Sequence, residues 1–206
     1  MTQRFNIHPD NPQRRLIQQS VEILRRDGLV VYPTDSCYAF GWHLGDHESA
    51  GRVQRIRGTG KDHNFTLMCR DLSEIATYAK VENWCYRLLR AHTPGPYTFI
   101  LKATREVPRR LQNPKRQTIG IRVPAHPVPL ALLEAVGEPM MSSTLLLPGQ
   151  PLPLSDPEEI ASSLAGRIDL LIDSGSCGIE PTTVVDVTGD YPAVIRQGRG
   201  DSTAFA

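Results

Sequence analysis

Apolar residues near the start of the chain first follow a helical spacing and then form a short continuous run. Over residues 16–24 they recur three or four positions apart, which is the spacing of one face of an α-helix. Asn11-Pro12 is typical of a helix start and Gly28 of a helix end. The run Leu29-Val30-Val31 then predicts a buried strand that continues to Tyr32.

The alternation of helical and strand patterns continues to the end of the chain. Helical spacing and helix-start residues predict further helices over residues 48–57, 72–78, 83–92, 128–136 and 155–164. Runs rich in apolar, aromatic or β-branched residues predict strands over residues 65–69, 97–102, 118–123, 140–147, 170–172, 183–187 and 194–196. We therefore predict a single α/β domain over residues 1–206, with a mixed sheet of about seven strands.

Composition agrees with a globular α/β chain and excludes few functions. Of the 206 residues 40% are hydrophobic, and the net charge of +1 does not by itself indicate a nucleic-acid partner. No apolar stretch approaches the roughly 20 residues that span a bilayer, and no secretory signal is visible, so we expect a cytoplasmic protein. The four cysteines lie far apart without histidines at zinc spacing, so we expect reduced thiols and no metal site.

The segment over residues 32–41, YPTDSCYAFG, places a proline, hydroxyls and a carboxylate directly after the first buried strand. In α/β folds ligands bind beyond the strand ends, so this chemistry is typical of the wall of a binding crevice. Turns are rich in the same residue types, and a polar loop without a ligand explains the local sequence equally well. His63 has the same two interpretations, a ligand contact or a solvated loop histidine.

Two arginines, Arg122 and Arg196, stand alone within or at the end of predicted strands. A guanidinium in such a place suits phosphate or carboxylate, because its forked donors match both anions; the alternative is a structural ion pair. Basic clusters over residues 52–57 and 109–116 form either further anion contacts or a solvated surface. No glycine-rich phosphate motif, paired acid–base carboxylates or Ser/His/Asp set is present.

Six short segments occur in the order found in the YrdC/YciO family, and the chain most closely resembles its YciO branch. They are YPTDS (32–36), RIR (55–57), PGPYT (94–98), GIRVPAHP (120–127), PTTVVD (181–186) and IRQG (195–198). Each segment alone is weak evidence, but six in one order over nearly the whole chain are specific. The resemblance implies an α/β sheet that twists around a deep, positively lined cavity.

The best-known members of this family make L-threonylcarbamoyladenylate from L-threonine, bicarbonate and ATP. Their product supplies the threonylcarbamoyl group on the adenosine beside certain tRNA anticodons. The resemblance therefore implies a cavity that holds an amino acid next to ATP, with Mg²⁺ on the phosphates and no tightly bound cofactor. It also implies affinity for double-stranded RNA or tRNA.

The resemblance assigns roles to individual residues where the motifs match. Arg55 and Arg57 would be catalytic by stabilising charge on the phosphates. Threonine would be bound by Thr34, Arg122 and Thr182. The nucleotide would contact Arg57, Thr118, Thr144 and Arg196.

Three departures from the synthase pattern bear on activity. Arg55 replaces a lysine, Leu146 replaces the asparagine of a Ser-x-Asn motif, and Cys69 stands where some synthases have histidine. A leucine side chain makes no hydrogen bond, and losing one oriented polar contact commonly slows a reaction by roughly 10²–10³-fold. We therefore expect weak or altered synthase activity. The alternatives are an RNA-binding protein without synthase activity and a carbamoyl- or adenylate-binding protein without catalysis.

Overall fold

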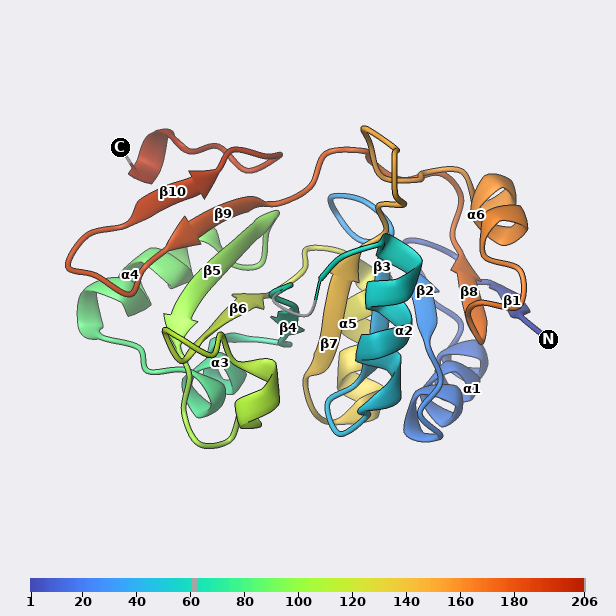
Figure 1. The fold of residues 1–206 in the computed structure, drawn as a ribbon, viewed down its shortest axis with the longest axis horizontal. Coiled ribbons are helices and arrows are strands. Elements are labelled where there is room, and N and C mark those ends of the chain that lie inside the picture. Colours follow the sequence, from blue (N-terminus) through green and yellow to red (C-terminus); the bar gives the residue numbers. More distant parts are fainter. Residues whose placement is uncertain (61–62, 206) are drawn as a thin grey trace.

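The computed structural model describes residues 1–60 and 63–205, which fold around one ten-stranded mixed sheet (Figure 1). The strand order is β1-β8-β2-β3-β7-β4-β6-β5-β9-β10. The pairs β1–β8, β2–β8, β4–β6 and β5–β9 are parallel, and the others are antiparallel. The predicted α/β class with a mixed sheet is therefore confirmed, whereas the predicted number of strands is too low.

The structure assigns the following bounds. The strands are β1 (Gln3–Asn6), β2 (Val30–Tyr32), β3 (Ala39–His43), β4 (Thr66–Met68), β5 (Tyr97–Lys102), β6 (Thr118–Arg122), β7 (Met140–Thr144), β8 (Leu170–Asp173), β9 (Thr183–Asp186) and β10 (Ala193–Arg196). The helices are α1 (Arg14–Arg25), α2 (Glu48–Arg57), α3 (Leu72–Tyr78), α4 (Asn83–His92), α5 (Pro127–Val136) and α6 (Pro157–Ser163). Two short 3₁₀ helices, η1 (Arg109–Leu111) and η2 (Thr203–Phe205), complete the described elements.

The helices lie where the sequence predicts them, because their periodicity and caps are local features. At the starts of α3 and α6, Asp71 and Asp156 each accept the backbone N–H three residues later, at 2.9 Å. The predicted cap of α1 at Asn11-Pro12 is wrong, since α1 begins at Arg14. His8 Nδ1 accepts the N–H of Asn11 at 3.1 Å, which holds this residue in a turn before the helix.

Two strands escaped prediction from the sequence, for opposite reasons. β1 is polar and mostly exposed at the sheet edge, and its parallel pairing with β8 depends on residues more than 160 positions away. β3 is buried, but it begins within the segment 32–41, which the sequence left open as a crevice wall or a polar loop. Gly41 in β3 lies against the Tyr32 ring, and a Cβ at this position would come within 2.5 Å of Tyr32 Cε1. Gly41 thus marks close packing rather than a turn.

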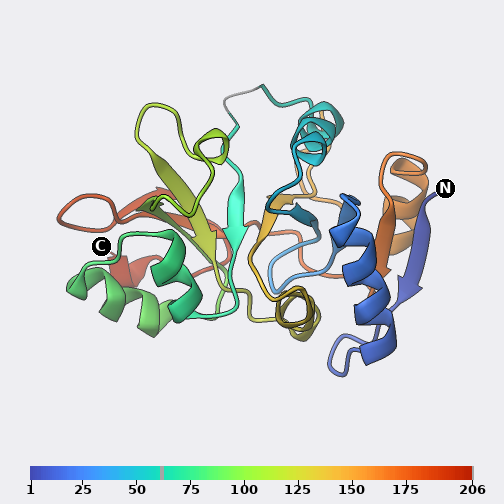
Figure 2. The ribbon, with the colours of Figure 1, turned by 90° about the horizontal axis from the view of Figure 1, so that it is seen from below.

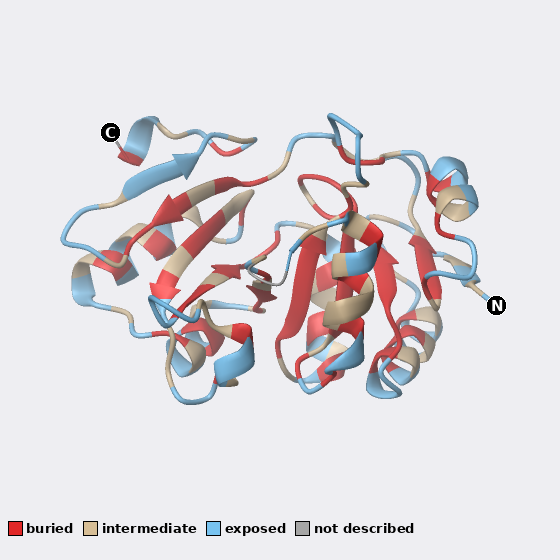
Figure 3. Ribbon diagram, in the orientation of Figure 1, coloured by how far each residue is buried: buried red, intermediate tan, exposed pale blue. Residues whose placement is uncertain are grey.

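Helices cover both faces of the sheet and enclose two hydrophobic cores. α1 and α5 lie on one face of the half that contains β2, β3 and β7, and α2 lies on the other (Figure 2). The first core joins α1 and α5 to that face. The larger core occupies the opposite face and extends to α4 and the C-terminal Phe205. Buried residues concentrate in the central strands, whereas β10 is exposed throughout (Figure 3).

The connection between β2 and β3 is fixed from two sides. Thr34 Oγ1 donates to the Cys37 carbonyl at 2.7 Å and accepts the Cys37 N–H at 3.2 Å, which closes a tight turn. The segment that joins β8 to β9 crosses this turn, where the Tyr38 hydroxyl donates to the Gly175 carbonyl at 2.7 Å. These contacts place residues 34–37 beside the central strands, where a cavity opens.

Candidate functional site

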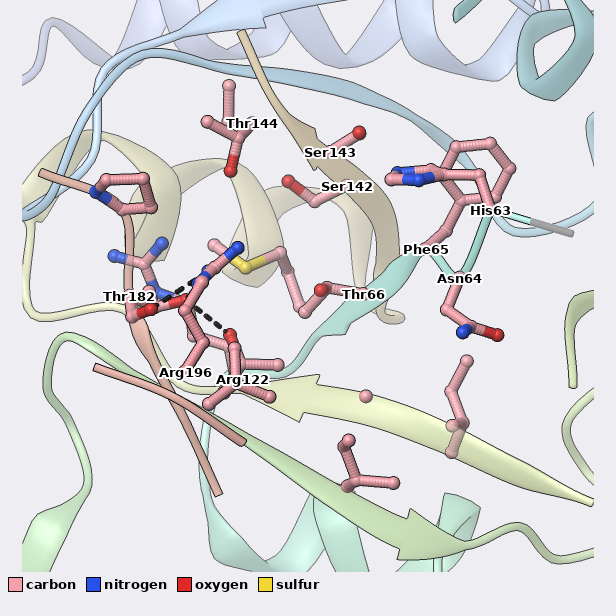
Figure 4. Close-up of a pocket in the computed structure, with 18 of the residues that line it drawn as sticks. His63, Asn64, Phe65, Thr66, Arg122, Ser142, Ser143, Thr144, Thr182 and Arg196 are labelled. Carbon is pink, nitrogen blue, oxygen red and sulfur yellow. Dashed lines mark hydrogen bonds between the residues drawn. The ribbon is translucent and has the colours of Figure 1, made fainter. Parts of the chain in front are cut away.

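A cavity of about 320 Å³ opens against the central strands, with side chains from β3 to β7 and from β9 and β10 in its wall (Figure 4). Ser142, Ser143 and Thr144 of β7 lie on one side. Arg122, Thr182 and Arg196 lie on the other. Hydroxyls and guanidinium groups therefore face each other across a space large enough for a small organic ligand.

The described lining residues carry positive charge without acidic neighbours in the wall. They include Arg57, Arg116, Arg122 and Arg196, and none of those described is aspartate or glutamate. Asp186 pairs with Arg116 at 2.7 Å, and a carboxylate behind the wall pairs with Arg122 at 2.5 Å. Among the described residues, Arg57 and Arg196 have no carboxylate partner, so this part of the cavity attracts anions.

Arg57, the last residue of α2, is held by three neutral acceptors. Its Nη1 donates to Ser143 Oγ and to His63 Nε2, both at 2.6 Å. Its Nε donates to the Leu146 carbonyl at 3.4 Å. Burial lowers the pKa of Arg57, and the nearby charge of Arg196 lowers it further. The two guanidinium groups thus repel each other across the cavity, and an anion between them would relieve the repulsion.

His63 accepts the bond from Arg57, which requires an unprotonated Nε2. Partial burial and the charge of Arg57 lower its pKa to about 4. The ring is therefore neutral at physiological pH, with its proton on Nδ1. The sequence left open a ligand contact or a solvated loop histidine. Neither describes His63 completely, because it lines the cavity and also accepts a hydrogen bond from the cavity residue Arg57.

Arg122, at the end of β6, is almost completely buried and points toward the turn after β2. Its Nη2 donates to Asp35 Oδ1 at 2.5 Å and to Thr34 Oγ1 at 3.3 Å. The structural ion pair, one of the two interpretations of this arginine, is therefore present, and Arg122 also lines the cavity, where contact with an anion stays a prediction. Thr34 is buried behind Arg122 and is not among the lining residues.

Thr182, directly before β9, and Arg196, at the end of β10, bring the last two strands into the cavity wall. Thr182 Oγ1 shares a hydrogen bond of 2.8 Å with Thr98 Oγ1, and Arg196 Nη2 donates to the Thr182 carbonyl at 2.9 Å. The other two predicted hydroxyls, Thr118 of β6 and Thr144 of β7, also line the cavity.

The structure thus brings together Arg57, Thr118, Arg122, Thr144, Thr182 and Arg196 and leaves Arg55 apart. Arg55 is exposed on α2 and is not a lining residue. Helical residues two apart point to different sides, which separates Arg55 from Arg57. Sequence reasoning missed the roles of Asp35, Ser143 and Thr98, because each acts through a partner more than 80 positions away.

The cysteine thiols add little chemistry to the site. Burial raises the pKa of Cys37, which lines the cavity, and of Cys69, which does not, so both thiols are protonated at neutral pH. Over residues 1–60 and 63–205, no three His, Cys, Asp or Glu side chains gather at a spacing that holds a metal. In the same part of the chain, no helix is both long and apolar enough to cross a bilayer.

Several known proteins resemble this chain over most of its length. The Sua5/YciO/YrdC family model, described as "Telomere recombination", matches residues 22–198. The Escherichia coli protein YciO, described as uncharacterized, is 57% identical over 205 residues, with 100% of both chains covered. Its crystal structure superposes with a TM-score of 0.97 over 100% of both chains.

More distant relatives carry a described activity. The threonylcarbamoyl-AMP synthase of Pyrococcus abyssi is 27% identical over 195 residues, which cover 91% of this chain and 56% of that protein. A crystal structure of P. abyssi Sua5 in complex with L-threonine matches with a TM-score of 0.87 at 26% identity, over 96% of this chain and 58% of that one. The chain therefore belongs to the Sua5/YciO/YrdC family.

Proposed function

We propose that the protein binds ATP and L-threonine in this cavity and forms L-threonylcarbamoyladenylate, with weak or altered activity. The observation that carries the proposal is the unequal charge along the cavity. Arg57 and Arg196 have no described carboxylate partner, whereas Asp35 neutralises Arg122. Arg57 and Arg196 suit the phosphates of ATP. The end of the cavity at Arg122 suits an amino acid, which has no net charge.

The reaction needs few acids or bases from the protein. The neutral amine of threonine and bicarbonate form a carbamate, in which a new C–N bond replaces a C–O bond of bicarbonate and water leaves. A carbamate oxygen then attacks the α-phosphorus of ATP. A new P–O bond forms, and the bond to the bridging oxygen breaks, so pyrophosphate leaves with its electron pair. Arg57 and Arg196 would stabilise the growing phosphate charge, and Arg122 and Thr182 would hold threonine. Thr118 and Thr144 would contact the nucleotide.

Thr34 and Arg55 do not line the cavity, so their expected roles change. Thr34 would act on threonine through Arg122, since its hydroxyl lies behind the guanidinium. The exposed position of Arg55 gives no support to a catalytic role. Mg²⁺ would arrive on the phosphates as MgATP, because the described lining residues offer no carboxylate ligand for it.

The relatives support the substrates of this proposal. The synthases of P. abyssi and Bacillus subtilis are named for threonylcarbamoyl-AMP, and P. abyssi Sua5 has been crystallised with L-threonine. These substrates fit the expected cytoplasmic location. Leu146 argues for weak activity, because it presents only its backbone carbonyl to Arg57, while its side chain in the cavity wall is apolar.

The test is threonine-dependent pyrophosphate release by the purified protein with ATP, bicarbonate and Mg²⁺, with the nucleotide product identified by mass. We expect slow release that requires threonine and falls by at least about 100-fold in Arg57→Ala. Absence of threonine-dependent release and of the adenylate product would refute the synthase proposal.

A second candidate is double-stranded RNA or tRNA binding without synthesis. It is favoured by the exposed basic residues Arg109, Arg110, Lys115 and Arg116, of which Arg116 also lines the cavity. Binding through phosphates would weaken steeply with salt, because each neutralised phosphate releases counterions. Affinity for a duplex RNA that is unchanged in a Lys115→Ala/Arg109→Ala double variant would argue against this surface.

A further inference from the structure

The ion pair between Arg122 and Asp35 has an unusual arrangement. The two side chains are only 8% and 12% exposed, and Nη2 and Oδ1 lie 2.5 Å apart. Arg122 belongs to the cavity wall, whereas Asp35 does not. The carboxylate therefore lies behind the guanidinium, as seen from the cavity.

A single guanidinium nitrogen of Arg122 makes all the described hydrogen bonds of this side chain. Asp35 Oδ1 and Thr34 Oγ1 both accept from Nη2, and Arg122 Nε and Asp35 Oδ2 are buried without a described partner. No partner of Nη1 occurs in residues 1–60 and 63–205. The pair thus fixes the guanidinium from behind and leaves Nη1 for a ligand.

The charge behind Arg122 affects which anion it can take. A zwitterionic amino acid brings one carboxylate and no net charge, which matches an arginine that already has a counter-charge. A phosphate carries up to two negative charges and would lie close to the buried carboxylate of Asp35. In this poorly hydrated site, repulsion between the phosphate and the Asp35 carboxylate disfavours the phosphate. Specificity against a competing ligand arises from such a repulsive contact.

We propose that Asp35 is the residue that determines ligand specificity at this end of the cavity, by reserving Arg122 for the carboxylate of a zwitterion and keeping phosphate away from it. The assignment of threonine to this end rests on the proposed function. The preference of Arg122 against phosphate does not, because it follows from the ion pair alone. In the intact protein, phosphates are then directed to Arg57 and Arg196.

The test counts inorganic phosphate sites by calorimetry at constant ionic strength. We expect one site in the wild-type protein, displaced by ATP and not by L-threonine. Asp35→Asn keeps an oxygen that accepts from Arg122 but removes the negative charge of the carboxylate. We therefore expect a second phosphate site at Arg122, where phosphate should bind at least tenfold more strongly than it does at Arg122 of the wild type. This second site should disappear in Asp35→Asn/Arg122→Gln. Glu158→Gln, at an exposed ion pair with Arg4, is the control and should leave one site.

Two phosphate sites in the wild-type protein, one of them lost in Arg122→Gln, would overturn the proposal, as would a single site in a folded Asp35→Asn. If Asp35→Asn does not fold, the wild-type competition decides, because phosphate displacement by L-threonine would contradict the proposal. A protein with no threonine turnover and the expected change from one phosphate site to two would refute the synthase while supporting the role of Asp35.

Discussion

Nη1 of Arg57 lies 2.6 Å from Nε2 of His63, so a neutral imidazole holds a cationic guanidinium at the cavity wall. We expect His63→Leu to raise the KM for ATP by roughly tenfold, because a hydrogen bond to a charged group contributes about 1.5–3 kcal/mol and this one is only partly buried. The KM for L-threonine should change less than twofold. The measurement is steady-state kinetics, or ATP binding by calorimetry.

The matched variant for this contact is His63→Gln. The amide oxygen of glutamine reaches the position of Nε2 and can accept from Arg57, so ATP affinity should be largely restored. Equal loss in His63→Leu and His63→Gln would mean that the ring, and not the accepted hydrogen bond, supports the site.

The same contact predicts a pH dependence of stability. The pKa of His63 is lowered from 6.5 to about 4 in the folded protein, so between these values the unfolded chain binds more protons. Stability that His63 contributes is therefore complete above pH 6.5 and declines as the pH falls toward 4. We expect the free energy of unfolding of the wild type to fall relative to that of His63→Gln over this range, as measured by urea denaturation. Parallel pH curves would contradict the lowered pKa.

Leu146 offers a gain-of-function prediction. Its carbonyl accepts from Arg57 Nε, and its side chain lines the cavity. Leu146→Asn would add an amide donor and acceptor to the wall, which we expect to raise threonine-dependent turnover by up to about tenfold. Leu146→Ala removes the same apolar atoms without adding a hydrogen bond, so a similar gain in both variants would indicate extra space rather than a polar contact.

Gly120 of β6 forms part of the cavity wall, where a side chain would occupy space that a ligand could use. A Cβ there would lie 3.2 Å from Thr98 Cγ2 and 3.6 Å from Thr66 Oγ1, both in the wall. We expect Gly120→Ala to weaken ATP binding by about three- to tenfold, with a cost in stability of no more than about 1–2 kcal/mol. Gly51→Ala in α2 is the control, since it should stabilise by about 0.5–1 kcal/mol and leave binding unchanged. Unchanged ATP affinity in Gly120→Ala would place the ligand away from this part of the wall.

Local patterns predicted the helices well because spacing and caps are properties of neighbouring residues. β1 and β3 could not be predicted in this way, because β1 is a polar edge strand and β3 contains Gly41, a turn-like residue in the sequence that packs against the Tyr32 ring in the structure. In both cases pairing with a strand distant in sequence, β8 for β1 and β7 for β3, stabilises the extended conformation.

For the site, the resemblance supplied residue types that the structure does bring together, but it could not supply their pairing. Asp35 neutralises Arg122 across 87 positions, and Ser143 holds Arg57 across 86. The separation of Arg55 from Arg57 was available from the sequence, because residues two apart on a helix differ by about 200° in direction. Helical geometry therefore limits how far a motif assigned by resemblance can be transferred.

The measurement that tests the central claim most directly compares Arg57→Ala with Arg55→Ala in threonine-dependent pyrophosphate release. The two arginines belong to the same helix, but only Arg57 lines the cavity and faces Arg196. We predict a loss of at least about 100-fold for Arg57→Ala and less than about twofold for Arg55→Ala. Equal losses in the two variants, or release that persists in Arg57→Ala, would contradict a reaction carried out between Arg57 and Arg196.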